Sequence, residues 1–254
     1  MKKLIVGENI VKSFGEGDEK RNVLDGVSVE IKEGEFVSVM GPSGSGKSTL
    51  LFALSGMDSV DKGKVAFDGR DLSTLSENEL ADLRRAKMGF VFQQPTLLKN
   101  LNILDNIILP SMRDHRKNAG QITEKARALL KRADIIELEK REITQASGGQ
   151  LQRVGICRAL MSEPSIIFGD EPTGALNSKA ANEIMKLLAE IHRSGTTILL
   201  VTHDVKVAAK TERVLFMLDG KITGEYLAGA YDEDCDDLKA REERLTAWLA
   251  EMKL

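Results

Sequence analysis

The chain is poor in cysteine and aromatic residues, and it has no long hydrophobic run. Its two cysteines, Cys157 and Cys235, stand far apart, which excludes a disulfide framework and a cysteine-based metal site. Without a stretch of about 18 apolar residues, no segment is predicted to span a membrane. The apolar run at residues 4–6 stops before Glu8 and Asn9 and is too short for a signal peptide. We therefore expect a cytoplasmic protein.

The chain also lacks a strong excess of either positive or negative charge. The 36 Lys and Arg residues against 39 Asp and Glu give a net charge of −3, which leaves no basic excess typical of nucleic-acid binding. The 254 residues can bury one large α/β core, with room for a helical insertion. Cys157 shares a helical stripe with Leu151, Val154 and Leu160, so we expect it to pack in the core.

Residues 41–48, GPSGSGKS, match the phosphate-loop pattern G-x-x-x-x-G-K-[ST]. The apolar run at residues 35–40 predicts a strand before the loop, and residues 49–54 predict a helix after it. The alternative is a glycine-rich turn that binds nothing. The flanking strand and helix and the intact Lys-Ser pair disfavour that alternative.

Each residue type in this loop has a chemical task. Three glycines let the backbone curl with its amides pointing inward. Lys47 places a positive charge on the β- and γ-phosphates, and the Ser48 hydroxyl can ligate Mg²⁺. The residues of the loop predicted to bind the nucleotide are Gly41, Ser43, Gly44, Ser45, Gly46, Lys47, Ser48 and Thr49.

A second small-residue loop, Ser147-Gly148-Gly149-Gln150, opens another predicted helix and can offer backbone N–H groups to a phosphate. One polypeptide rarely needs two anion cradles for a single triphosphate. Two cradles make sense if two copies of the chain close head-to-tail around ATP, each giving one cradle to each site. The sequence therefore predicts a homodimer in the ATP-bound state.

A buried strand predicted at residues 165–169 ends in two carboxylates, Asp170 and Glu171. Parallel α/β sheets place ligand chemistry at the carboxyl ends of their strands. Asp170 would hold Mg²⁺ through its waters, and Glu171 would polarise the attacking water. A solvated acidic turn before Pro172 is the alternative, and the phosphate loop in the same chain makes it the weaker one.

A third strand of this type is predicted at residues 196–202, and it ends at His203. An imidazole there could hydrogen-bond the γ-phosphate and the region of Glu171. A lone histidine is more often structural than catalytic, but this one follows a strand of the same kind as the other two. We assign no role to His115 or His192, which lie in polar or helical settings.

The motifs stand in an order that resembles the ATP-binding-cassette (ABC) ATPases: the phosphate loop, Gln93, Ser147-Gly148-Gly149-Gln150, Asp170-Glu171 and His203. The resemblance covers about residues 4–225 and is closest to the lipoprotein-releasing, macrolide-export and cell-division group. Within that group, residues 171–178 look most like the bacitracin-type peptide-resistance branch. The resemblance implies an α/β P-loop NTPase fold with a mainly parallel core sheet, an antiparallel β subdomain and a helical subdomain.

The same resemblance implies roles for two further residues near the nucleotide. Phe14 would stack on adenine, and the less favoured alternative is that this aromatic on the first strand packs in the core. Gln93 would complete the Mg²⁺ shell and report the nucleotide state to a membrane partner. Its neighbour Gln94 is the alternative for that role.

The family pattern also assigns the remaining contacts with Mg-ATP. Glu171 would align the water, with Lys47 and His203 stabilising the γ-phosphate as charge develops. The dimer interface would include residues 175–177. The metal ligands would be Ser48, Gln93 and Asp170. The loop that reaches the partner's γ-phosphate would be Ser147, Gly148 and Gly149, with Gln150 beside them.

Three departures from the family pattern stand close to these motifs. Ala146 replaces a Leu that packs the second loop, so the effect should be modest. Gly169 replaces a larger residue before the carboxylate pair and is expected to loosen the strand end. Asn177 replaces Asp and removes a charge from the contact between the sites. None removes a catalytic group, so we expect an active ATPase.

The organisation predicted is an ABC ATPase domain at residues 1–230, interrupted by a helical subdomain at about 95–160, and a tail at 231–254. Short strands are expected up to about residue 30. A polar loop is expected at 112–121, between helices. The other elements predicted are an exposed turn at 15–20, a strand at 64–69, a helix at 76–87 and a hairpin around Asp219-Gly220.

Two apolar groups have two interpretations each. Leu97, Leu98, Leu101 and Ile103 would line the groove that receives a coupling helix of the permease, or form the core of the helical subdomain. The tail combines an acidic run at residues 232–237 with a predicted amphipathic helix. Packing of this helix on its own domain is favoured over docking to the permease or the twin subunit. Its apolar stripe is Leu238, Leu245, Trp248, Leu249 and Met252.

We expect the ATP-hydrolysing subunit of a bacterial transporter, bound to a permease at the inner face of the membrane and acting on peptide, lipoprotein-like or antibiotic substrates. Chromosome-clamping ATPases separate their cradles with a coiled coil, and no sustained heptad occurs here. Translation ATPases carry two cassettes per chain, and this chain has one. Two alternatives stay open: a soluble iron–sulfur-assembly ATPase, and an ATPase that transmits force without moving substrate.

Overall fold

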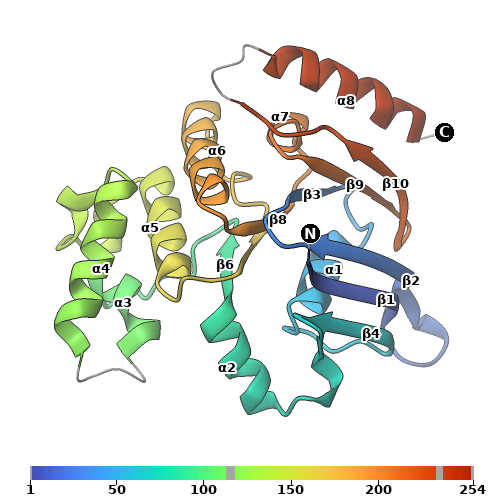
Figure 1. Cartoon of the computed structure of the whole chain (residues 1–254), viewed down its shortest axis with the longest axis horizontal. Coiled ribbons are helices and arrows are strands. Elements are labelled where there is room, and N and C mark those ends of the chain that lie inside the picture. Colours follow the sequence, from blue (N-terminus) through green and yellow to red (C-terminus); the bar gives the residue numbers. More distant parts are fainter. Residues whose placement is uncertain (1, 113–117, 233–236, 253–254) are drawn as a thin grey trace. The chain divides into compact units, whose positions relative to one another are not determined.

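The computed structural model describes residues 2–112, 118–232 and 237–252. It divides into two compact units (Figure 1). Unit 1 consists of Met1–Ala81 and Gly195–Leu254, and unit 2 consists of Asp82–Ser194. The phosphate loop and His203 therefore belong to unit 1, whereas Gln93, the Ser147 loop and the Asp170-Glu171 pair belong to unit 2.

An antiparallel sheet forms the first layer of unit 1. The strands β1 (Lys3–Phe14) and β2 (Arg21–Lys32) pair along their whole length, from Lys3 opposite Lys32 to Phe14 opposite Arg21. The other side of β1 pairs with β4 (Lys62–Phe67), which in turn pairs with β5 (Arg70–Asp71). This sheet is the antiparallel β subdomain that the sequence predicts.

The expectation of short strands in the first 30 residues is wrong. The structure has two strands of twelve residues each. The polar pair Glu8-Asn9 does not interrupt β1, because the pairing register shifts between Gly7 and Ile10 and Asn9 adopts a positive φ of 49°. A bulge of this kind absorbs an extra residue and keeps the strand continuous.

The second sheet of unit 1 is parallel at its centre. The strand β3 (Phe36–Met40) runs parallel to β8 (Thr197–Val201) on one side and to β9 (Arg213–Leu218) on the other. All residues of β3 and β8 are buried, which explains their uninterrupted apolar runs. The hairpin predicted around Asp219-Gly220 is confirmed, because β10 (Lys221–Leu227) pairs antiparallel with β9.

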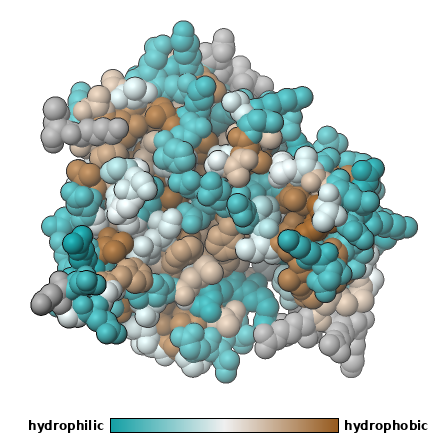
Figure 2. Space-filling view, turned by 180° about the vertical axis from the view of Figure 1, so that it is seen from behind, coloured by the Kyte–Doolittle hydropathy of each residue, from teal (hydrophilic) through white to brown (hydrophobic). Residues whose placement is uncertain are grey.

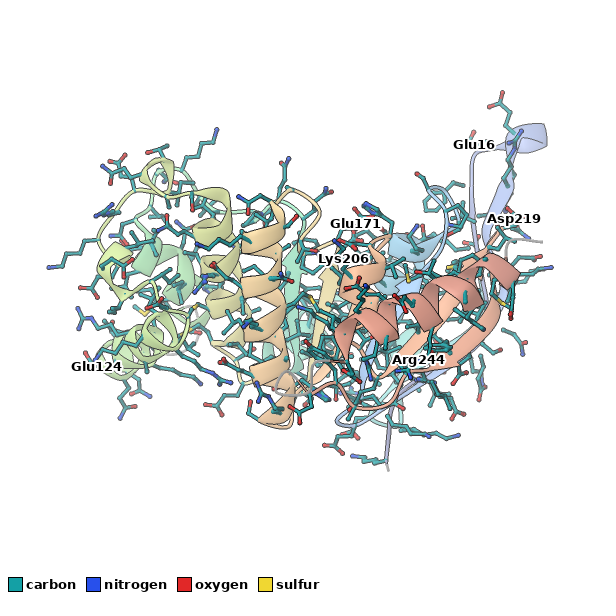
Figure 3. The ribbon with its side chains drawn as sticks, turned by 90° about the horizontal axis from the view of Figure 1, so that it is seen from above. Glu16, Glu124, Glu171, Lys206, Asp219 and Arg244 are labelled. Atoms are coloured by element: carbon teal, nitrogen blue, oxygen red, sulfur yellow. The ribbon has the colours of Figure 1, made fainter. Side chains whose placement is uncertain are left out.

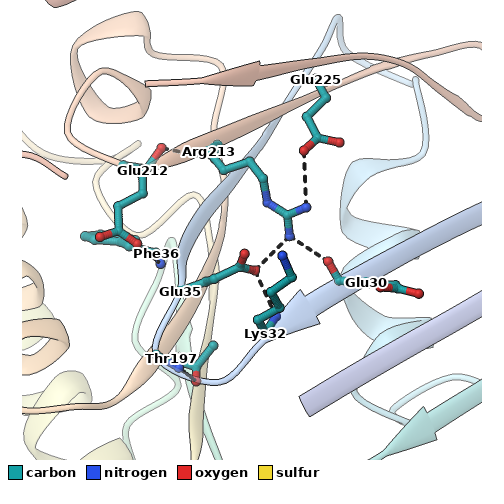
Figure 4. Close-up of polar contacts among 10 residues, drawn as sticks. Glu30, Lys32, Glu35, Phe36, Thr197, Glu212, Arg213 and Glu225 are labelled. Carbon is teal, nitrogen blue, oxygen red and sulfur yellow. Dashed lines mark hydrogen bonds and ion pairs between the residues drawn. The ribbon is translucent and has the colours of Figure 1, made fainter. Parts of the chain in front are cut away.

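A half-buried guanidinium joins the two sheets of unit 1 (Figure 4). Arg213 of β9 donates to the backbone oxygen of Glu30 at 2.6 Å and to Glu35 Oε2 at 2.8 Å. It also reaches Glu225 Oε1 of β10 at 3.4 Å. Glu35 Oε2 accepts a further bond of 2.8 Å from the amide of Lys32. One side chain thus connects β2, β9, β10 and the turn that leads into β3.

The helices of unit 1 are α1 (Lys47–Leu54), α7 (Val205–Ala208) and α8 (Leu238–Met252). Short 3-10 turns lie at Gly17–Glu19 and Leu72–Thr74. The predicted helix at 76–87 is α2 (Glu77–Lys87), which extends across the division between the units.

The tail helix α8 packs on unit 1 (Figure 1), as the favoured interpretation predicts. The ring of Trp248 lies 5.4 Å from that of Tyr226 and 6.2 Å from that of Phe216. Residues 233–236, which include Cys235 and most of the acidic run, lie outside the described residues. Leu245 and Leu249 of α8 join an apolar cluster of unit 1, with Leu238 and Met252 at its margin. The other buried members of this cluster are Met40, Ala208, Ala209, Val214 and Phe216.

Unit 2 combines two parallel strands with helices. The strands are β6 (Met88–Phe92) and β7 (Ile166–Asp170). The α-helices are α3 (Ile103–Met112), α4 (Ala119–Arg132), α5 (Gly148–Leu160) and α6 (Ser178–Arg193). Short 3-10 turns lie at Ile136–Leu138 and Ile143–Gln145. The helical content between residues 95 and 160 agrees with the predicted helical subdomain.

The polar loop predicted at 112–121 ends earlier than expected, because α4 already begins at Ala119. Residues 113–117, which include His115, lie outside the described ranges. Figure 2 shows a face on which hydrophilic residues predominate and apolar residues form separate small areas. In the part of the chain that the structure describes, no helix is long and apolar enough to cross a bilayer.

Candidate functional site

The phosphate loop lies between β3 and α1, and its glycines are required by its geometry. Gly41, Gly44 and Gly46 have φ values of 152°, 80° and 99°. A Cβ at Gly41 would lie 2.0 Å from the backbone oxygen of Met217, and one at Gly46 would lie 2.5 Å from that of Val23. Side chains at these two positions would collide with backbone, so the curl of amides depends on glycine.

Two side chains of the phosphate loop, those of Ser45 and Lys47, are buried. Lys47 is buried, and its ammonium donates to the backbone oxygens of Gly41 and Pro42 at 3.0 and 2.8 Å. The Ser45 hydroxyl is buried without a hydrogen-bond partner among the described residues. Of the remaining residues, Ser43 and Gly44 are exposed, whereas Ser48 and Thr49 are half-buried on the first turn of α1.

His203 lies at the same sheet edge as the phosphate loop. Because β3 and β8 are adjacent and parallel, the residues that follow them leave the sheet side by side. The amide of Thr202 donates to the backbone oxygen of Val39 at 3.1 Å, which fixes this alignment at the ends of the strands. His203 itself is exposed.

Phe14 is not a core residue. It stands at the end of β1 with 49% of its surface exposed, which removes the alternative that it packs in the core. The ammonium of Lys12 lies 5.4 Å from the centre of its ring, and Lys12 is held by Asp58 Oδ1 at 2.8 Å and the backbone oxygen of Ser59 at 2.7 Å. The ring is therefore available for stacking with a base.

In unit 2, the side chains of Gln93 and Glu171 converge. The strands β6 and β7 are parallel, with Phe92 opposite Asp170, so the residues that follow them leave the sheet together. A Cβ added at Gly174 would lie 2.9 Å from Gln93 Nε2 and 3.1 Å from Glu171 Oε2. Both Gln93 and Gln94 are exposed, so the convergence with Glu171 is what favours Gln93 over its neighbour.

The backbone at Glu171 adopts an uncommon conformation. Its φ of 48° lies in the left-handed region, which a non-glycine residue rarely occupies. The turn that follows is closed by a 2.9 Å bond from the amide of Gly174 to the backbone oxygen of Glu171. Strained residues of this kind concentrate at functional sites. Asp170 and Glu171 are both half-buried.

Two polar residues of α5 hold the segment that carries Gln93. Gln152 is buried, and its amide donates to the backbone oxygen of Phe92 at 2.9 Å. Arg158 donates to the backbone oxygen and hydroxyl of Thr96 at 2.6 and 3.3 Å. Burial lowers the pKa of the Arg158 guanidinium from its ordinary value. Neither residue stands in a motif that predicts this role from the sequence.

The Ser147 loop begins α5 with a capping box. The hydroxyl of Ser147 accepts from the amide of Gln150 at 3.3 Å, and the side chain of Gln150 accepts from the amide of Ser147 at 2.8 Å. Both side chains are thus engaged within the loop. Ser147 and Gly148 are exposed, which leaves the amide-bearing face of the loop open to a ligand.

The next helix approaches this loop closely. A Cβ at Gly149 would lie 3.1 Å from the Cβ of Ala180, whereas one at Gly148 would meet only Leu176 Cδ2, at 3.6 Å. Asn177 caps α6 by accepting from the amide of Ala180 at 2.9 Å. The neutral amide therefore performs the capping that an aspartate would perform.

Some of the four predicted groove residues suit a docking groove, and others suit the core of the helical subdomain. Leu98 is 47% exposed, as a docking surface requires. Ile103 is fully buried in the core of unit 2, and Leu97 and Leu101 are half-buried. Asn106 is buried and bonds both the amide and the oxygen of Leu98, at 2.7 and 3.1 Å, so the exposed leucine stands on a fixed backbone.

Among the described residues, no group of three or more His, Cys, Asp or Glu side chains could hold a metal ion. The candidate ligands Ser48, Gln93 and Asp170 supply a hydroxyl, an amide and one carboxylate. Oxygen donors of this kind suit Mg²⁺, which keeps several waters and usually binds together with substrate phosphates. The donor set fits Mg-nucleotide better than a free metal ion.

Comparisons with known proteins agree with the motifs. The sequence signature of the family described as ABC transporter matches residues 24–174. The macrolide export ATP-binding/permease protein MacB of Marinobacter nauticus is 42% identical over 98% of this chain and 39% of its own length. MacB of Pasteurella multocida is 42% identical over 87% of this chain and 34% of its own length. The chain thus spans well under half the length of these curated relatives.

Relatives of similar length also occur. An uncharacterized ABC transporter ATP-binding protein of Methanocaldococcus jannaschii is 42% identical over 86% of this chain and 97% of its own length. Among solved structures, a dimeric ATP-binding cassette in a post-hydrolysis state bound to ADP and Pi has a TM-score of 0.80 at 38% identity, covering 89% of this chain and all of that one. A subunit of an ABC transporter complex of Clostridium perfringens has a TM-score of 0.82 at 26% identity, with each chain fully covered.

Proposed function

Because this chain belongs to the ABC transporter family and is an ATPase of that family, we propose that it hydrolyses ATP in order to drive a membrane permease. The observation that carries the proposal is the position of the motif residues at the carboxyl ends of parallel strands. The phosphate loop and His203 follow the neighbouring strands β3 and β8, and Gln93 and Glu171 follow the neighbouring strands β6 and β7.

The roles of the individual residues follow from their chemistry. Lys47 and the amides around Gly46 bind the β- and γ-phosphates, and the exposed ring of Phe14 stacks on adenine. Ser48, Gln93 and Asp170 hold Mg²⁺. When bound, this ion neutralises part of the charge on the phosphates.

The hydrolytic step depends on Glu171 and His203. The carboxylate of Glu171 orients the attacking water and accepts its proton as the water oxygen bonds to the γ-phosphorus and the bond to the bridging oxygen of ADP breaks. The His203 imidazole stabilises the γ-phosphoryl oxygens as negative charge shifts toward the leaving group. The left-handed backbone at Glu171 lies in the turn that brings its carboxylate near Gln93 and Gly174.

We propose further that two copies of the chain close head-to-tail around ATP. Each Ser147 loop would then face the γ-phosphate that the phosphate loop of the other copy holds. A dimeric arrangement is described for the solved cassette bound to ADP and Pi. In this chain, the exposed Ser147 and Gly148 present the start of α5 to such a ligand.

The partner proposed is a membrane permease, and the place of action is the cytoplasmic face of its membrane. The relatives named macrolide export ATP-binding/permease protein combine both functions in their names. The word macrolide in those names supports antibiotic substrates, and peptide or lipoprotein-like substrates are proposed from the sequence resemblance alone. The finer assignment to the peptide-resistance branch remains a prediction, as does transmission of force without transport.

The assignment of Glu171 is tested by Glu171→Gln, with Glu124→Gln on α4 as the control (Figure 3). Glu171→Gln should bind a fluorescent ATP analogue as tightly as the wild type and release phosphate at least about 100-fold more slowly. The exposed Glu124 should be replaceable without effect. Turnover by Glu171→Gln within a few-fold of the wild type would show that another group activates the water.

The permease is tested by affinity purification. Tagged Glu171→Gln protein is incubated with Mg-ATP and detergent-solubilised source membranes, and the captured proteins are identified by mass spectrometry. Recovery of a multi-span permease supports the proposed function. Recovery of soluble proteins alone would contradict it and favour the iron–sulfur-assembly alternative.

A further inference from the structure

Arg241, in the first turn of α8, is the most completely engaged side chain of the tail. It is 4% exposed, and within the described ranges the acceptors of its guanidinium are five backbone oxygens. Two acceptors follow α7: Ala209 at 2.8 Å and Thr211 at 3.1 Å. The other three follow β10: Ala228, Gly229 and Ala230, at 2.9, 2.9 and 3.3 Å.

The helix α7 cannot fix its own position. It has four residues, and a single helical turn is unstable unless other elements hold it. Ala208 and Ala209 are buried in the apolar cluster that includes Leu245 and Leu249 of α8. Apolar packing and the Arg241 hydrogen bonds therefore both reach α7 from the same helix.

His203 is connected to α7 without a flexible spacer. Asp204 caps the helix by accepting from the amide of Lys206 at 2.8 Å, and its own amide donates to the Thr202 hydroxyl at 3.0 Å. The segment from Thr202 to Ala209 is thus bonded at its start and at its end. A shift of the carboxyl end of α7 would therefore also move His203, which directly precedes the capping residue Asp204.

We propose that Arg241 is a positioning residue for ATP hydrolysis, which holds His203 in place through α7. The inference rests on the proposed role of His203. A guanidinium suits this task because its planar fork of five N–H donors can bond two backbone segments at once. Burying a charge is costly, and an apolar side chain of similar size would stabilise the helix contact without orienting the carbonyls.

The experiment compares four variants of the full chain: Arg241→Ala, Arg241→Lys, His203→Ala and the double variant Arg241→Ala/His203→Ala. The matched control is Arg244→Ala, an exposed arginine of the same helix (Figure 3). Steady-state phosphate release at varied ATP gives kcat and KM for each. Thermal unfolding and the fluorescence of Trp248, the only tryptophan, report whether α8 stays docked.

We expect His203→Ala to lower kcat about 100-fold. Arg241→Ala should lower kcat about 10-fold with KM within about 2-fold, since misplacement of a group by about 1 Å costs up to 100-fold in rate. Arg241→Lys, which keeps the charge and three donors, should fall between the wild type and Arg241→Ala. Arg244→Ala should match the wild type.

The double variant separates positioning from general destabilisation. If Arg241 acts through His203, removing Arg241 has no further effect on kcat once His203 is alanine. An unchanged 10-fold loss in the His203→Ala background would overturn the inference, as would wild-type kcat in folded Arg241→Ala. If Arg241→Ala does not fold, the loss of kcat in Arg241→Lys is compared with its loss in the double variant Arg241→Lys/His203→Ala. Wild-type kcat in His203→Ala would instead contradict the proposed function of His203.

Discussion

Gly148 and Gly149 form a natural pair for testing the second anion cradle. Both stand at the start of α5, and both are expected to offer amides to a phosphate. A methyl group at Gly148 meets only Leu176 Cδ2 at 3.6 Å, an ordinary van der Waals contact. A methyl group at Gly149 comes within 3.1 Å of Ala180 Cβ, so α6 must move. The two substitutions therefore differ in their effect on the folded chain.

The magnitude for Gly148→Ala follows from helix propensity. Neither glycine has a positive φ, so alanine fits the backbone. Replacing glycine with alanine in a helix is worth up to about 1 kcal/mol, and about half of that is expected in the first turn. For a chain of 254 residues, a gain of about 0.5 kcal/mol raises Tm by about 1–2 °C. Gly149→Ala should gain nothing, because the contact with Ala180 offsets the propensity.

Activity should change in the opposite direction to stability for Gly148→Ala. Its methyl group occupies the open side of the loop, where the γ-phosphate of the partner copy is proposed to bind. The substitution keeps the amide N–H but holds the phosphate away from it, so we expect kcat to fall about 100-fold, as large as the loss on removing one preorganised donor. The assay is thermal unfolding without nucleotide, followed by steady-state phosphate release. A stable Gly148→Ala protein with wild-type kcat would refute the proposed contact of this loop with phosphate.

Two further predictions concern unit 1 and the core. Phe14→Ala should weaken ATP binding about 5- to 100-fold, because aromatic stacking on a base is worth about 1–3 kcal/mol; titration with a fluorescent ATP analogue measures this, and an unchanged affinity would place adenine elsewhere. Burial raises the pKa of the Cys157 thiol to about 12 from an ordinary 9.0. Since the folded chain then holds this proton more tightly than the unfolded chain, the free energy of unfolding should fall as pH rises from about 9 to 12. Urea titrations at several pH values measure how steeply the free energy of unfolding falls with pH, and the fall should be smaller for Cys157→Ala. An equal fall in the wild type and the variant would show that the thiol of Cys157 does not cause it.

The strands that carry the motifs were predictable because they are buried on both faces. Runs such as residues 165–169 and 196–202 lack polar interruptions, so their position could be inferred from composition alone. The length of β1 and β2 was not predictable. Buried and exposed residues are mixed along both strands, so neither shows a continuous apolar run. In the sequence, the polar residues at the Asn9 bulge look like the end of a strand.

The polar residues that support the site were missed for a related reason. Gln152 and Arg158 lie on α5, where polar side chains are usually assigned to the solvent. Gln152 is buried, and its side-chain amide donates to the backbone oxygen of Phe92 at the end of β6. Its place between Leu151 and Val154 on the helix was the available signal. The environment of Phe14 was undecidable from sequence, because the same residue type suits a core and a stacking surface.

The ion-pair network around Arg213 has a mechanical consequence. Phe14 stands on the antiparallel sheet of unit 1, and the phosphate loop follows β3 of its parallel sheet. Arg213 bonds both sheets at once, through Glu30 on one and Glu225 on the other, and through Glu35 at the turn between them. These bonds restrain the two sheets of unit 1 relative to each other. In the proposed function, the ring of Phe14 receives the base and the phosphate loop receives the phosphates, so the same restraint would set the spacing between the two ends of a bound nucleotide.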